Sequence, residues 1–127
     1  MNFLVDTNIF LEILLGQPNK GRCKSFLQEN TARCAISDFA AHSIGVICYR
    51  SRRQQVYQAF LSDIFPATTL LHLDKQGYAA VLQSHQRYGL DFDDAYHFTL
   101  ARSCGLTLVT QDSDFDRVKA EVSLRFL

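Results

Sequence analysis

The sequence predicts an α/β protein with a doubly wound, mostly parallel sheet of four to five strands and helices on both faces. Two observations lead to this prediction. Short apolar stretches alternate with longer stretches of helical periodicity, and Gly, Pro, Ser, Thr and Asp mark the junctions. The chain has 127 residues, of which 47% are hydrophobic, and this suffices for one core. Residues 1–127 are therefore predicted to form a single domain.

The first predicted elements are a strand and two helices. The strand is the apolar run NFLVD, residues 2–6. A helix over residues 8–15 follows at once, with Thr7 or Asn8 as its N-cap and a glycine just past its end. A second helix covers residues 20–30.

The middle of the chain repeats the strand–helix pattern. RCAIS, residues 33–37, is a predicted strand, and Ser37 or Asp38 caps the helix that follows. That helix runs to about Tyr49. The next helix, residues 54–65, ends before a proline, which cannot continue it.

The third quarter contains a strand and two helices. TTLLHL, residues 68–73, is the strand, and Asp74 caps a helix that runs to Tyr88. Asp91 starts another helix, which ends before Gly105.

Two strands and a short helix complete the chain. LTLVT, residues 106–110, is a strand, a short helix starts at Asp114, and the last strand lies within EVSLRFL, residues 121–127. Because the strands alternate with helices, we expect them to be parallel and to end at one common edge. Binding sites in open parallel sheets lie just beyond this edge.

Several acids follow strand ends or begin helices. Asp6, Asp38 and Asp112 come at or just after the ends of predicted strands, so we expect them at the carboxyl edge of the sheet. Three more acids begin the helix in the third quarter: Asp91, Asp93 and Asp94. Helix capping alone explains most acids in such positions.

Capping does not explain Asp6, Asp94 and Asp112. The residues after Asp6 can cap the first helix. Asp91 already caps the helix that contains Asp94. Asp114 is better placed than Asp112 to cap the short helix. These three acids therefore need another role.

Three carboxylates at one edge repel one another unless a positive charge neutralises them. A hard divalent cation, Mg²⁺ or Mn²⁺, is the expected ligand because it prefers oxygen donors. Such an ion binds phosphate oxygens and activates or orients a water for in-line attack. This is the chemistry of phosphodiester hydrolysis.

The overall charge indicates neither a nucleic acid nor a membrane surface, since 13 basic and 13 acidic residues balance. The only dense basic cluster contains Arg50, Arg52 and Arg53. It either contacts phosphates or complements the end of the preceding helix.

The cysteines and the absence of targeting patterns favour a cytoplasmic protein. The four cysteines show no CxxC pair and no zinc-ligand spacing, which is typical of reduced thiols in the cytoplasm. We expect neither a signal peptide nor a membrane-spanning segment.

Three segments together resemble the PIN domain, the nuclease fold of the VapC-type toxins of toxin–antitoxin systems. FLVDTNIFLEILLG opens the chain, DDAYHFTLA lies in its third quarter, and LVTQDSDF lies near its end. Their order and separation match the family, and the resemblance covers nearly the whole chain. It implies a three-layer PIN-like fold and cleavage of RNA that depends on Mg²⁺ or Mn²⁺.

The resemblance also implies roles for individual residues. Asp6, Asp94 and Asp112 are expected to hold the metal ion and to carry catalysis. The residues expected to support them are Asn8, Asp91, Asp93, Thr110 and Asp114. Thr110 is expected to orient a carboxylate or a water.

One position departs from the family pattern. PIN domains commonly carry a Glu in the helix after the second strand, and His42 stands at that place here. His42 is a packing residue, a phosphate-binding or metal-adjacent residue, or a sign of lost activity. Asp38 lies four residues earlier on the same helix face, and it or Asp91 is expected to supply the missing charge.

Two functional hypotheses follow. The first is a metal-dependent endoribonuclease, the toxin of a toxin–antitoxin pair. The second is a catalytically impaired PIN-like module that binds RNA or a protein partner, with its acid replaced by His42. The resemblance implies an RNA substrate, an antitoxin protein and a homodimer. The nearly all-apolar first helix packs either in the core or against such a partner.

Overall fold

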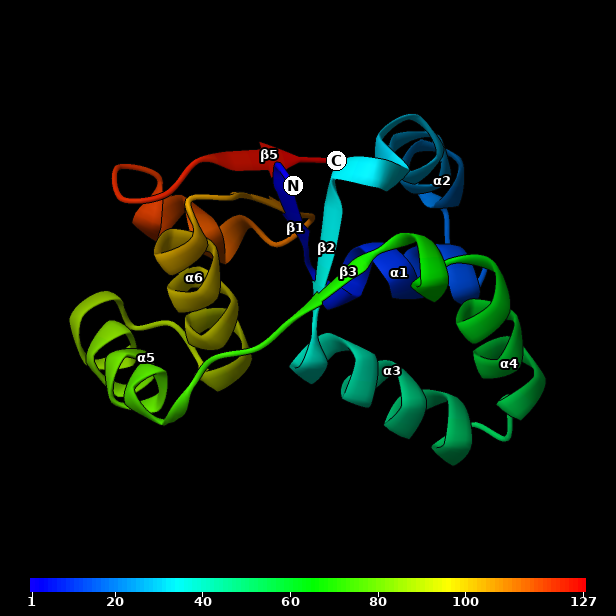
Figure 1. The fold of residues 1–127 in the computed structure, drawn as a ribbon, viewed down its shortest axis with the longest axis horizontal. Helices are drawn as coiled ribbons and strands as arrows, with labels where there is room; N and C mark the ends of the chain where they lie inside the picture. The colour runs from blue at the N-terminus through cyan, green and yellow to red at the C-terminus, as the bar shows by residue number, and fades with distance from the viewer.

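The computed structural model describes residues 1–127 and contains one five-stranded sheet. The strand order is β3-β2-β1-β4-β5, and every neighbouring pair is parallel (Figure 1). The strands are β1 (Phe3–Val5), β2 (Cys34–Ser37), β3 (Thr69–Leu71), β4 (Thr107–Thr110) and β5 (Leu124–Phe126). The predicted α/β class and the parallel sheet are confirmed.

Helices connect the strands and cover both faces of the sheet. The α-helices are α1 (Thr7–Leu14), α2 (Lys20–Asn30), α3 (Asp38–Arg50), α4 (Gln54–Asp63), α5 (Lys75–Tyr88) and α6 (Phe92–Cys104). Three short 3₁₀ segments complete the chain: η1 (Thr31–Arg33), η2 (Phe65–Ala67) and η3 (Ser113–Val118). Figure 1 shows α5 and α6 on one side of the sheet and the other four α-helices on the opposite side.

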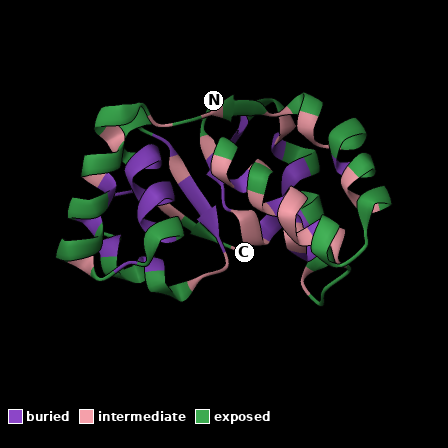
Figure 2. Ribbon diagram, turned by 90° about the horizontal axis from the view of Figure 1, so that it is seen from below, coloured by how far each residue is buried: buried purple, intermediate pink, exposed green.

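The sheet separates two hydrophobic cores because successive side chains of a strand point to opposite faces. Leu4 and Leu108 belong to the core under α5 and α6. Their neighbours Val5 and Val109 belong to the core under α1–α4. Figure 2 shows the buried central strand between helices whose outer faces are exposed. The predicted three-layer arrangement is confirmed.

Two predicted helix caps are wrong, and both errors have one physical reason. Asp6 itself caps α1, because its Oδ1 accepts the backbone N–H of Thr7 at 2.8 Å. Asp112 caps η3, because its Oδ1 accepts the N–H of Asp114 at 2.9 Å. In both places the strand runs into the helical segment with almost no linker, so the acid that follows the strand is also the residue that precedes the helix.

Other predicted ends agree with the structure to within a few residues. Ser37 caps α3, Asp74 caps α5 and Asp91 caps α6. Gly89 and Gly105 end α5 and α6 in the left-handed conformation, with φ of 70° and 65°. None of the helices combines the length and apolar composition that a membrane span needs.

Candidate metal centre

The candidate site lies where β1 and β4 end side by side. These strands are paired in parallel, with Val5 opposite Val109, and the N–H of Asp6 donates to the carbonyl of Val109 at 2.8 Å. This pairing brings the residues after the two strands, Asp6 and Thr110, to the same edge. The start of α6 supplies the third component of the site, Asp94.

Asp6 is held in a fixed orientation and is only 6% exposed. Its Oδ1 accepts the N–H of Thr7 at 2.8 Å, and its Oδ2 accepts the hydroxyl of Thr110 at 2.7 Å. The Thr110 Oγ1 in turn accepts the N–H of Asp112 at 3.0 Å. Thr110 therefore links the first acid to the backbone of the last.

Asn8 ties α1 to the segment after β4. Its Nδ2 donates to Thr110 Oγ1 at 3.4 Å, and its Oδ1 accepts the N–H of Gln111 at 3.3 Å. Both bonds hold this segment beside Asp6, so Asn8 lies where a residue supporting that acid would be.

Asp94 is the most perturbed acid of the site. Its carboxyl is 6% exposed and shares a neighbourhood with Asp112 and Asp114, in which one oxygen from each lies within 4.8 Å of the others. Burial, followed by the nearby carboxylates of Asp91, Asp112, Asp93 and Asp6 in that order, raises the pKa of Asp94 to about 8. The charges that act on this carboxyl are negative, so the donor set fits a hard divalent cation.

Asp91 and Asp93 form the exposed rim of the same cluster, and one oxygen from each lies within 4.8 Å of one from Asp94. Asp91 accepts the N–H of Asp94 at 3.2 Å as the cap of α6. A hydrogen bond from the Asp93 carboxyl lowers the pKa of Asp91, whereas burial and Asp91 raise the pKa of Asp93. The carboxyls of Asp91 and Asp93 are therefore linked to each other by a hydrogen bond, next to the buried carboxyl of Asp94.

Asp114 is exposed and lies near the guanidinium group of Arg117. Its Oδ1 is 3.8 Å from Nη2 of Arg117, whose other terminal nitrogen donates to the carbonyl of Gly89 at 2.8 Å. Arg117 thereby joins η3 to the loop before α6.

His97 is a residue of the site that the sequence reasoning missed. Its ring is 1% exposed, and its Nδ1 lies 3.8 Å from Oδ1 of Asp6. Nδ1–H donates to the carbonyl of Asp93 at 3.0 Å, which leaves Nε2 to accept the hydroxyl of Ser37 at 2.8 Å. The available signal was its spacing: three residues after Asp94, His97 lies on the same face of α6.

A second missed feature is a buried polar network behind Asn8. Glu12, 9% exposed on α1, accepts the N–H of Asn19 at 2.7 Å and Nε2 of Gln111 at 3.2 Å. The Asn19 side chain donates to Oε1 of Gln111 at 2.7 Å. This network fixes the residue that immediately precedes Asp112.

Asp38 and His42 lie together, but outside the two carboxylate groups that contain Asp94. Asp38 Oδ1 accepts the hydroxyl of Tyr96 at 2.7 Å. His42 is exposed and lines a hollow with Asp38, Phe39 and Tyr96. Asp38 and His42 therefore lie on the same face of α3, as predicted, and this face borders a hollow beside the acid cluster.

The three arginines of the basic cluster are exposed, and each belongs to a different local element. Arg50, in the last turn of α3, lines a second hollow together with His42, Tyr49 and Tyr57. Arg52 has a φ of 58° in the turn after α3, and Arg53 precedes α4. Arg50 is therefore the member of this cluster that lies beside His42.

The parallel sheet and the carboxylates at its edge define an α/β domain with a candidate divalent-metal centre. The model of the PIN domain family matches residues 3–121, so the chain belongs to the PIN domain family. A comparison with curated proteins gives no match to the sequence.

Solved structures of toxin–antitoxin proteins share this fold. VapBC from Salmonella typhimurium, solved bound to DNA, is 20% identical with a TM-score of 0.82 over 99% of this chain and 98% of that chain. VapBC2 from Rickettsia felis, bound to a DNA fragment from its promoter, is 16% identical with a TM-score of 0.82 over 100% and 99%. VapC20 from Mycobacterium tuberculosis, a toxin that cleaves the sarcin–ricin loop, is 19% identical with a TM-score of 0.77 over 98% and 99%.

Proposed function

We propose that this protein is a metal-dependent endoribonuclease that acts as the toxin of a toxin–antitoxin pair. The observation that carries the proposal is the buried carboxyl of Asp94, which is surrounded by four other carboxyls at the carboxyl edge of the sheet. An arrangement of this kind is costly without a cation and well suited to one. Membership of the PIN family supports the nuclease class.

In this proposal Asp6, Asp94 and Asp112 hold Mg²⁺ or Mn²⁺. Each carboxylate oxygen of Asp6 accepts one hydrogen bond from the protein, so a second lone pair remains on each for a metal. A divalent ion at this place lowers the pKa of a water and polarises the phosphate that the water attacks. Thr110 keeps Asp6 in position through the hydrogen bond from its hydroxyl, and a bound cation would favour the ionised form of Asp94.

The competing hypothesis, a PIN-like module without activity, depends on His42 having replaced a metal-binding acid. The exposed His42 lies in a hollow with Asp38, and the carboxylate groups around Asp94 are built from other residues. This placement favours an acid cluster that works without a carboxylate at position 42.

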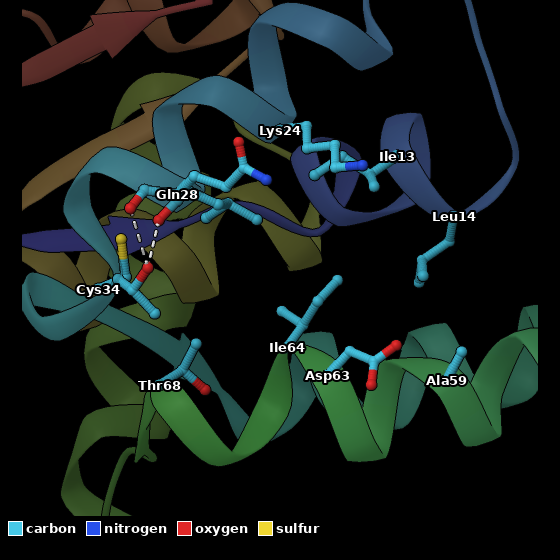
Figure 3. A pocket seen from close by; sticks show the side chains of 11 residues that line it. Ile13, Leu14, Lys24, Gln28, Cys34, Ala59, Asp63, Ile64 and Thr68 are labelled. Carbon is cyan, nitrogen blue, oxygen red and sulfur yellow. Dashed lines mark hydrogen bonds between the residues drawn. The ribbon is translucent and has the colours of Figure 1, made fainter.

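We also propose an antitoxin partner, because the similar solved structures include toxin–antitoxin complexes. A groove of about 350 Å³ between α1, α2 and α4 is the candidate docking site (Figure 3). Ile13, Leu14 and Ile64 line it, and the exposed Lys24 and Asp63 provide one charge of each sign. An apolar antitoxin helix with a few flanking charges fits this surface.

The remaining parts of the proposal follow from the family. Single-stranded or looped RNA is the substrate, with Arg50, Arg52 and Arg53 as candidate phosphate contacts, and the toxin is a homodimer. The proposed compartment is the cytoplasm, where the four free cysteines stay reduced.

The test is cleavage of a panel of fluorescent single-stranded RNAs by the antitoxin-free protein, with Mg²⁺, Mn²⁺ or EDTA. We expect cutting with a divalent ion only, and a loss of about 100-fold or more in Asp6→Asn and Asp94→Asn. Glu29→Gln changes an exposed acid on α2 that belongs to neither carboxylate group around Asp94 and serves as the matched control. Folded protein that binds RNA but cuts none of the panel with either metal would favour the binding module instead.

A further inference from the structure

A hollow beside the candidate metal centre has no role in the proposed metal binding. It has a volume of about 340 Å³ and is lined by Asp38, Phe39, His42, Tyr78 and Tyr96, from α3, α5 and α6. We propose that it binds one unpaired RNA base next to the scissile phosphate, with a carboxylate reading the amino or imino hydrogens of that base. This inference rests on the proposed function and names a substrate contact of the same site.

The hollow is one layer of side chains away from the metal centre. Tyr96 lies two residues after Asp94 on α6. The Phe39 ring meets the His97 ring edge-on, with centroids 5.8 Å apart, and His97 lies 3.8 Å from Asp6. A base in the hollow and a phosphate at the acids can therefore belong to adjoining parts of one RNA strand.

Aromatic rings supply the walls. Phe39 and Tyr96 have ring centroids 5.4 Å apart and an interplanar angle of 30°, and Tyr78 meets Tyr96 edge-on at 6.1 Å. Tyr78 is 50% exposed, so half of its side chain is open to a ligand. Tyr96 is 1% exposed and therefore forms the floor of the hollow, so the half-exposed Tyr78 is the ring that can stack an unpaired base.

Asp38 supplies the polar group. Its Oδ1 accepts the Tyr96 hydroxyl at 2.7 Å and the N–H of Phe39 at 2.8 Å, whereas its Oδ2 accepts no hydrogen bond from the protein. A free carboxylate oxygen repels a phosphate and attracts N–H groups. It therefore selects the Watson–Crick edge of a base that offers amino or imino donors, and guanine offers two such donors side by side.

His42 connects this hollow to a second one. The second hollow, of about 420 Å³, is lined by His42, Tyr49, Arg50 and Tyr57 among others. Arg50 places a cation there, which suits the phosphate of the next nucleotide. The two hollows along α3 thus give a base contact followed by a phosphate contact.

The test measures binding separately from cleavage. Short fluorescein-labelled RNAs that differ in one base are titrated against the full chain in EDTA, and anisotropy is recorded. We expect Tyr78→Ala to weaken binding by about fivefold or more, with recovery in Tyr78→Phe. Asp38→Asn should reduce the preference for guanine over uracil, and Leu82→Ala, an exposed residue on the same helix, should change neither.

The outcomes separate this inference from the proposed nuclease activity. A base preference that disappears in Asp38→Asn supports the hollow even if the protein cuts no RNA. Unchanged affinity and unchanged base preference in both Tyr78→Ala and Asp38→Asn overturn it, even if metal-dependent cleavage is found.

Discussion

Asp94 illustrates how a single residue can favour function over stability. Its carboxyl is buried among four other carboxyls, and its pKa is raised to about 8. The unfolded chain ionises the same group near pH 3.9. Between these values the folded protein holds a proton that the unfolded chain releases, so Asp94 lowers stability progressively as the pH rises.

Replacing this carboxyl should therefore stabilise the metal-free protein. At pH 8 we expect Asp94→Asn to raise the free energy of unfolding by at least about 1.4 kcal/mol, the equivalent of one pKa unit. The gain should shrink as the pH falls and vanish below about pH 3, where both states are protonated. Urea unfolding in EDTA at several pH values measures it, and a loss of stability at pH 8 would contradict the assigned environment.

The residues of the site were predictable to different degrees. Asp6 and Asp112 could be found because each follows an apolar strand, and Asp94 because a second acid already capped its helix. His97 was missed because its one sequence signal, a spacing of three residues from Asp94 on the same helix, is shared with ordinary packing residues. Its role appears only when β2 brings Ser37 to its Nε2 atom.

At the scale of the elements, helix caps show that an acid can serve two purposes. Asp6 caps α1 and its charge also helps to raise the pKa of Asp94, whereas Asp74 caps α5 by accepting the N–H of Gly77 at 2.9 Å and belongs to neither carboxylate group around Asp94. The sequence analysis separated the two acids on a premise that is wrong for Asp6, since it assigned the cap of α1 to Thr7 or Asn8.

Asp74 offers a control for effects of capping alone. We expect Asp74→Ala to lower the free energy of unfolding by about 1 kcal/mol without changing RNA cleavage or Mn²⁺ binding. Thermal unfolding and the cleavage assay, run side by side, measure both effects. Loss of cleavage in this variant would mean that helix stability, rather than the acid cluster, limits activity.

Glycines and loops set the ends of α5 and α6 more clearly than the starts of α1 and η3. Gly89 and Gly105 both adopt the left-handed conformation that the sequence predicted. The start of α1 was misplaced because β1 passes into it directly at Asp6. Local patterns locate a helix end well when a specialised residue marks it, and poorly when strand and helix share a residue.

For the whole molecule, the alternation of strands and helices was enough to predict a parallel sheet between two layers. The order of the strands was not predictable. β1 lies at the centre between β2 and β4, although it comes first in the chain. Its residues Leu4 and Val5 are fully buried on opposite faces, but a sequence pattern does not say which strands cover its two sides.

The arrangement places all the acids of the cluster at one end of the sheet, where a cation would join β1, β4 and α6. An ion that binds only the folded protein stabilises the whole molecule, by about 2.7 kcal/mol at 100 times its Kd. The melting temperature therefore reports on the site without any assumption about the substrate.

The most direct test is thermal unfolding of the wild type, Asp94→Asn and Asp74→Asn over a range of Mn²⁺ concentrations at pH 7.5. We predict that Mn²⁺ raises the melting temperature of the wild type and of Asp74→Asn in a saturable way. Asp94→Asn should start higher without metal and respond little to it. An equal rise in the wild type and Asp94→Asn, or no rise in either, would contradict a divalent-metal centre at this edge of the sheet.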